Sequence, residues 1–167
     1  DKQNQDVKQY MGAVGIKHKI YVGEDASIQS TFATTINNID MHTELLGNDD
    51  RLLPKNIVRN TYLNFIALSD FQKRFGRIHT NRTRIRWTGL RYDLTFADAA
   101  GHIGDLVEIA DESGFSSLVN IYSESMLTLG NKVKMNIGIT GQWFTLNDRY
   151  TIEPRLSVKW KFAPRQS

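Results

Sequence analysis

Apolar and polar residues alternate along most of this chain, and that alternation limits the possible folds more than any other feature. The clearest example is RYTIEPRLSVKWKF, at positions 149–162. Its even positions carry mostly apolar or aromatic side chains, and most of its odd positions carry charged ones. Successive side chains of a β-strand point to opposite faces, so the pattern predicts a strand with one apolar and one charged face.

The same period of two recurs from one end of the chain to the other, whereas helical periodicity is hard to find. We therefore predict an all-β fold, an antiparallel up-and-down meander of about seven long strands. The expected strands are 10–22, 27–45, 57–71, 79–96, 115–127, 132–143 and 149–162. In the fourth of these the apolar phase changes near Thr88 and Gly89, which predicts a β-bulge there.

The expected connections differ in length. GEDAS, QKRFGR and LGNK are short turns, while GNDDRLLPKN and the stretch 98–113 are longer loops rich in Gly, Asn and Asp. Short turns at one rim and long loops at the other are typical of outer-membrane β-barrels. Strands of this length also exceed those of ordinary globular sheets.

Composition excludes several classes. The 21 Lys and Arg residues nearly balance 18 Asp and Glu residues, so the charge of +3 does not indicate a nucleic-acid partner. Cysteine is absent, which excludes disulfides and thiolate chemistry. No apolar run reaches the roughly 20 residues of a membrane-spanning helix. The polar start, without an initiating Met, is interpreted as that of a processed or excised piece.

Two interpretations of the alternation remain open. In a soluble β-barrel or sandwich the apolar faces would pack together and could bind a small apolar ligand. In a membrane barrel the same faces would contact lipid. Long cationic side chains on the polar face and aromatic residues near strand ends favour the membrane barrel.

The run NKVKMNIGITGQWFTLNDRYTIEPRLSVKWKFAPRQS, at 131–167, resembles the barrel of TonB-dependent outer-membrane receptors of the Bacteroidetes type. The matching residues are Gly138, Gly141, Phe144, Leu146, Asn147, Glu153, Pro154, Arg155 and Leu156. Earlier stretches resemble the family more loosely. The family's next strand, its plug domain, its TonB-contacting segment and a signal sequence are not found. Seven strands are also an odd number for a bacterial barrel. We therefore expect one partial domain, 1–167, as a barrel segment.

The resemblance implies a segment of a transporter in the Gram-negative outer membrane that takes up a nutrient and performs no reaction. It implies contacts with outer-membrane lipid and with the plug and remaining barrel of the parent chain. TonB would act only through the absent plug; the nutrient is unidentified, and no cofactor or nucleic acid is expected. Arg149, Glu153, Arg155 and Lys159 would face the lumen. Ile152, Leu156, Val158 and Trp160 would face lipid.

Other candidate sites are weaker. RIHTNRTRIRWTGLR could bind single-stranded nucleic acid, but Arg82, Arg84 and Arg86 alternate as residues of one strand face do. The acids of the stretch 98–113 lack the regular spacing of a calcium loop. No two histidines have the spacing of metal ligands, and no nucleophile with a flanking base is found, so neither a zinc site nor an enzyme is predicted. Opposite charges at Glu153 and Arg155 are expected to pair with neighbouring strands.

Overall fold

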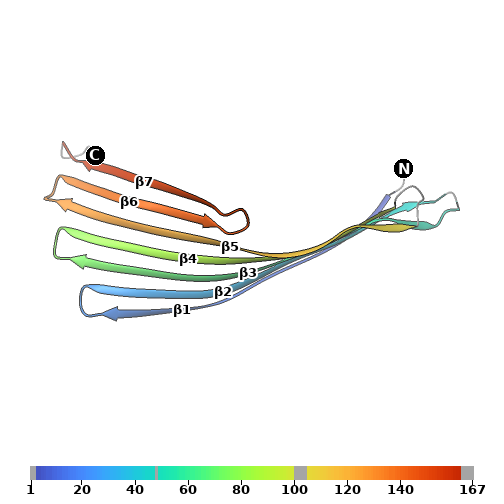
Figure 1. Cartoon of the computed structure of the whole chain (residues 1–167), viewed down its shortest axis with the longest axis horizontal. Helices are drawn as coiled ribbons and strands as arrows, with labels where there is room; N and C mark the ends of the chain where they lie inside the picture. The colour runs from blue at the N-terminus through green and yellow to red at the C-terminus, as the bar shows by residue number, and fades with distance from the viewer. Residues whose placement is uncertain (1–2, 48, 100–104, 163–167) are drawn as a thin grey trace. The chain divides into compact units, whose positions relative to one another are not determined.

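A computed structural model describes residues 3–47, 49–99 and 105–162. These residues form seven antiparallel strands in one sheet and no helix, which confirms the predicted all-β meander (Figure 1). Within this part of the chain, no helix could cross a membrane. The strands are β1 (Gln3–Val22), β2 (Ala26–Leu46), β3 (Leu52–Phe75), β4 (His79–Ala99), β5 (Leu106–Leu129), β6 (Val133–Phe144) and β7 (Arg149–Trp160).

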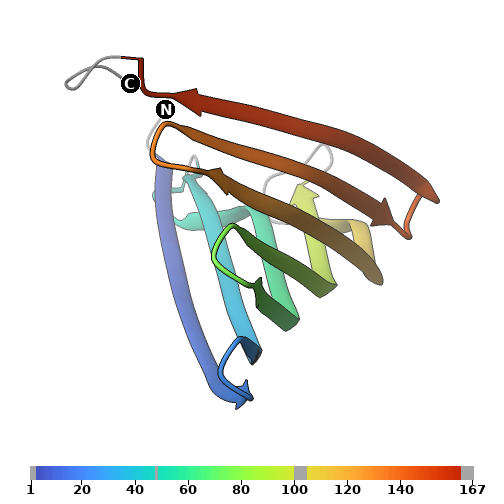
Figure 2. The same cartoon turned by 90° about the vertical axis from the view of Figure 1, so that its left-hand side faces the viewer.

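The strands follow one another in the sheet in the order of the sequence, as Figure 2 shows from blue β1 to red β7. Each consecutive pair is joined as a hairpin, the simplest connection between antiparallel strands. In this order β1 and β7 each have one hydrogen-bonded neighbour among the described strands. Pro154 lies in β7, consistent with the rule that proline is tolerated on an edge strand.

Three short turns begin at a glycine in the left-handed backbone region. Gly23, Gly76 and Gly130 have φ of 67°, 72° and 64° and connect β1 to β2, β3 to β4, and β5 to β6. Glycine adopts this conformation without steric cost, so these turns stop their strands sharply. The β6–β7 turn uses Asp148, with φ of 51°. The β1–β2 and β5–β6 turns lie within GEDAS and LGNK, and the β3–β4 turn extends one residue beyond QKRFGR.

The two longer connections are shorter than predicted. β3 begins at Leu52, so Pro54 lies inside a strand and not in a loop; proline is tolerated near the first residues of a strand. β5 begins at Leu106, so Glu108, Asp111 and Glu112 are strand residues. Pairing with the neighbouring strand outweighs the local preferences of these residues. Part of the second predicted loop, 100–104, lies outside the described residues.

The chain divides into two compact units. Unit 1 comprises 1–14, 34–65 and 90–115, and unit 2 comprises 15–33, 66–89 and 116–167. Each of the strands β1 to β5 contributes to both units, and β6 and β7 belong to unit 2. The four short turns are in unit 2, and the two longer connections belong to unit 1.

No apolar side chain of the described residues is buried. Apart from Gly89, the buried residues are polar: Thr43, Asp70 and Thr88, with 2%, 5% and 8% of their surface exposed. A single sheet has two open faces, so its apolar side chains remain exposed unless another layer, another molecule or lipid covers them. What covers the apolar side chains is therefore the central functional question.

Candidate functional site: the two faces of unit 2

The register of β6 and β7 separates apolar from polar side chains. We call the side carrying the even-numbered residues of β7 the apolar face. There Trp143 lies opposite Tyr150, Ile137 opposite Leu156, and Val133 opposite Trp160. The register between β5 and β6 extends this face to Ile121 and Leu127. Most of its large side chains are exposed, Ile152 by 64% and Leu156 by 69%.

The odd-numbered residues of β7 lie on the opposite side, which we call the polar face. It carries all four residues expected in the lumen, Arg149, Glu153, Arg155 and Lys159. The four residues expected to contact lipid, Ile152, Leu156, Val158 and Trp160, lie on the apolar face. The division into two groups follows from the register. The lumen and lipid assignments themselves stay predictions.

Glu153 and Arg155 pair with each other and not with neighbouring strands. Their side-chain atoms Oε2 and Nη2 are 3.5 Å apart. The expected cross-strand pairing is wrong for β6, because the residues of β6 opposite them are uncharged: Thr140 faces Glu153, and Gly138 faces Arg155. Residues two apart on a strand share a face, so the nearest opposite charge for each is on its own strand.

The best-formed polar site on this face centres on Asp70 of β3. Its carboxylate accepts hydrogen bonds from Arg82 Nε at 2.8 Å and from Arg84 Nε at 3.0 Å, and also bonds an Nη2 of each. Asp70 is 5% exposed, while the two arginine side chains remain 48% and 40% exposed. One carboxylate therefore holds two guanidinium groups, and Arg82 and Arg84 share a face, as the sequence predicted.

Tyr122 and Glu124 of β5 continue this polar face. The Tyr122 hydroxyl donates a hydrogen bond to the Glu124 carboxylate. The arginine alternation predicted the face of Arg82 and Arg84, but not the partner that holds them. Asp70 is 12 residues from Arg82, and the only signal for it in the sequence is an acid preceding the β3–β4 turn.

A polar cluster interrupts the apolar face on β4 and β5, and sequence analysis missed it. Asn81 Nδ2 lies 3.2 Å from Ser125 Oγ, and Thr83 Oγ1 donates to Asn81 Oδ1 at 3.1 Å. Thr83 Oγ1 is also 3.0 Å from Ser123 Oγ, and His79 Nε2 is 3.1 Å from Ser125 Oγ. These side chains satisfy one another, so the cluster does not require an external partner.

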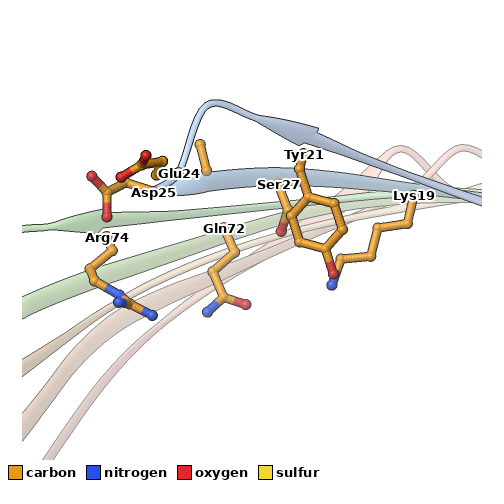
Figure 3. Close-up of a pocket in the computed structure, with 8 residues that line it drawn as sticks. Lys19, Tyr21, Glu24, Asp25, Ser27, Gln72 and Arg74 are labelled. Carbon is orange, nitrogen blue, oxygen red and sulfur yellow. The ribbon is translucent and has the colours of Figure 1, made fainter.

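The turn end of β1 to β3 has a shallow hollow on the polar face. Figure 3 shows Lys19, Tyr21, Gln72 and Arg74 pointing to the same side of the sheet. The Lys19 ammonium lies 4.6 Å from the centre of the Tyr21 ring, within range of a cation–π contact. Acids at the β1–β2 turn also line the hollow, so its charges are mixed, and it indicates no particular ligand.

Unit 1 has its own polar contacts. Asp40 lies 2.9 Å from His42 Nε2 and 3.5 Å from Arg59 Nε, and Asn4 donates to Glu44 at 3.0 Å. In the described ranges no three His, Cys, Asp or Glu residues gather as metal ligands.

No family model matches the chain, and no curated protein matches it.

Proposed function

We propose that this chain forms part of the wall of an outer-membrane β-barrel of the TonB-dependent receptor class and serves nutrient uptake. The apolar face of unit 2 contacts lipid, and the polar face lines the water-filled interior with the plug. The single observation that carries the proposal is a two-faced sheet whose apolar side chains are exposed. The resemblance of residues 131–167 supplies the class.

The spacing of aromatic residues on β7 supports contact with lipid. Tyr150 and Trp160 lie at opposite ends of the apolar face, with Ile152, Leu156 and Val158 between them. Ten residue steps of about 3.3 Å separate the two aromatic side chains by roughly 33 Å along the strand. A strand tilted by about 40° then spans roughly 25 Å of membrane thickness, the height of the apolar band of such barrels. Aromatic side chains at both boundaries match the girdles of these barrels.

The polar cluster of β4 and β5 is compatible with this environment. Hydrocarbon offers no hydrogen bonds, so polar groups that face it must pair within the protein. Asn81, Thr83 and Ser123 do so through hydrogen bonds to one another and to neighbouring strand residues.

The decisive experiment compares two neighbouring residues of β7 in the full-length receptor to which this barrel segment would belong. Val158→Lys places a charge on the apolar face, and Ser157→Lys places it on the polar face. We expect Val158→Lys to reduce insertion into lipid vesicles, since a lysine facing hydrocarbon costs about 2–4 kcal/mol at the midplane and less toward the boundary at Trp160. Ser157→Lys should insert like the unmodified chain. Protease protection and heat-modifiable migration in gels measure the inserted fraction.

Equal insertion of both variants would refute the assignment of faces. A chain that stays monomeric in buffer without detergent, with Val158 protected from solvent, would favour the alternative of a soluble β-barrel or sandwich with a small apolar ligand. Fluorescence quenching of Trp160 by lipid-attached quenchers provides an independent measurement. The fluorescence of Trp160 should be quenched in vesicles if its side chain contacts acyl chains.

A further inference from the structure

Four lysines gather on the polar face where β6 begins and β7 ends. Lys134 and Lys159 are direct cross-strand partners. Lys132 and Lys161 come next, joined by a backbone hydrogen bond of 2.8 Å from Lys161 N to Lys132 O. Together with Asn131 these four line one small cavity. Among the described residues none of the four forms an ion pair, unlike the arginines bound to Asp70.

This arrangement is unfavourable by itself. Like charges directly opposite each other on antiparallel strands destabilise the pair. Lysine on an edge strand can prevent aggregation, which would explain Lys159 and Lys161 on or next to β7. That explanation does not apply to Lys134, because β6 lies between β5 and β7. The next cross-strand pair on the polar face is Asn136 and Ser157. Both residues are uncharged, so neither compensates the charge of the lysines.

We infer that these lysines form a binding site for a small multivalent oxyanion, a phosphate or phosphoryl group. Side chains two apart on a strand are about 7 Å apart, and direct partners about 5 Å, so four ammonium groups can surround one small anion. Lysine binds phosphate as a point charge, and a multivalent anion can offset several ammonium groups at once. The Asn131 amide adds a neutral donor to the cavity lining. The site uses only β6 and β7 and their flanking residues, so it stands whether or not the apolar face contacts lipid.

Isothermal titration of the full chain with inorganic phosphate tests the site directly. We expect saturable binding that the double variant Lys134→Gln/Lys159→Gln weakens about tenfold or more, since each ammonium near the anion contributes up to about fivefold even in water. Lys17→Gln/Lys19→Gln is the matched control, because it removes two charges from β1 on the polar face. The control should bind phosphate like the unmodified chain.

A charge reversal separates a ligand site from an incidental cluster. Lys134→Glu places an acid opposite Lys159, which should raise the midpoint of urea unfolding without phosphate and abolish the stabilisation that phosphate gives the unmodified chain. No binding of phosphate, equal weakening in the β1 control, or equal competition by chloride at matched ionic strength would overturn the inference. Retained binding in Lys134→Arg/Lys159→Arg would support it.

Discussion

The two units distribute their charges differently over the same strands. On β2 the even positions of unit 2 include Ile28 and Phe32, whereas in unit 1 the even positions beyond Ile36 and Asn38 carry Asp40, His42 and Glu44. Asp40, which contacts His42 and Arg59, therefore lies on the side of β2 that carries apolar residues in unit 2. One continuous strand can thus present hydrocarbon-compatible side chains over part of its length and charged ones over the rest.

On β4, as on β2, the positions that carry apolar side chains differ between the two units. Ile85 and Trp87 occupy odd positions in unit 2, while Leu94 and Phe96 occupy even positions in unit 1. A bulge was predicted to explain this slip. However, the contacts of β4 with β5 keep the same offset, from Thr83 with Ser123 to Thr95 with Asp111. A single inserted residue in one strand would put the latter pair on opposite faces, so the bulge prediction is wrong for this pair of strands.

The difference teaches what the alternation means. A face needs to be apolar only over the length that contacts lipid, and the strands of outer-membrane barrels can continue beyond it into water. In our proposal unit 2 supplies the lipid-contacting band, while unit 1 has water on both faces. Substitutions at matched positions of the two units can break this comparison.

The largest expected effect comes from placing lysine at an even-numbered position of β2 in each unit, on the same side of the strand. Phe32→Lys in unit 2 replaces a side chain that is 59% exposed on the apolar face. It should lower insertion into vesicles by an amount equivalent to at most about 2–4 kcal/mol, the cost of a lysine at the bilayer midplane. His42→Lys in unit 1 places an ammonium group beside Asp40 and should insert normally. If both variants insert equally well or equally poorly, the two units do not differ in their contact with lipid.

The next effect concerns the buried carboxylate of unit 2. Asp70→Asn removes the charge-assisted hydrogen bonds to Arg82 and Arg84 and should lower the free energy of unfolding by about 1–3 kcal/mol. Asp40→Asn is the matched change in unit 1. Asp40 is 30% exposed, and its Oδ1, the atom nearest His42 and Arg59, accepts no hydrogen bond from the described residues, so less than about 1 kcal/mol is expected.

Urea unfolding of the folded chain in detergent measures both changes. Asp70→Glu, which keeps the charge, serves as a control for the loss of the ion pair. A larger loss for Asp40→Asn than for Asp70→Asn would show that unit 1 depends more on its ion pairs than the geometry indicates.

Sequence reasoning predicted the strands, the short turns and the two faces of β7, because each follows from local alternation and turn chemistry. It could not predict Asp70 as the partner of Arg82 and Arg84, since that contact depends on the register between β3 and β4. The cluster around Asn81 and Ser125 joins residues 44 apart. Strand pairing also extended β5 toward Leu106 through acids that suggested a loop. The local sequence predicts the alternation along a strand, but it does not predict which residue of the neighbouring strand lies opposite.

A smaller effect is expected from close packing in unit 1. Gly114 lies beneath the Tyr92 ring, and a Cβ at this position would approach ring atoms to 2.6–2.7 Å. Gly114→Ala should therefore displace the ring and cost about 1 kcal/mol, as modest overpacking does. Tyr92→Leu should remove most of this penalty in the double variant. An additive double variant, measured by urea unfolding, would exclude the contact.

The smallest effect tests the polar cluster on the apolar face of unit 2. Asn81→Ala removes one hydrogen-bond partner from each of Thr83 and Ser125, which keep Ser123 and His79 as partners, and should cost up to about 1 kcal/mol. Replacing the whole group by apolar residues, with His79→Leu, Asn81→Leu, Thr83→Val, Ser123→Ala and Ser125→Ala, should be nearly neutral in vesicles because no unpaired polar group of the cluster faces hydrocarbon. The same set should promote aggregation in buffer, since it enlarges an exposed apolar surface. If the multiple variant instead loses insertion while Asn81→Ala retains it, the cluster contacts water or a polar partner, and the lipid-contacting surface ends before β4.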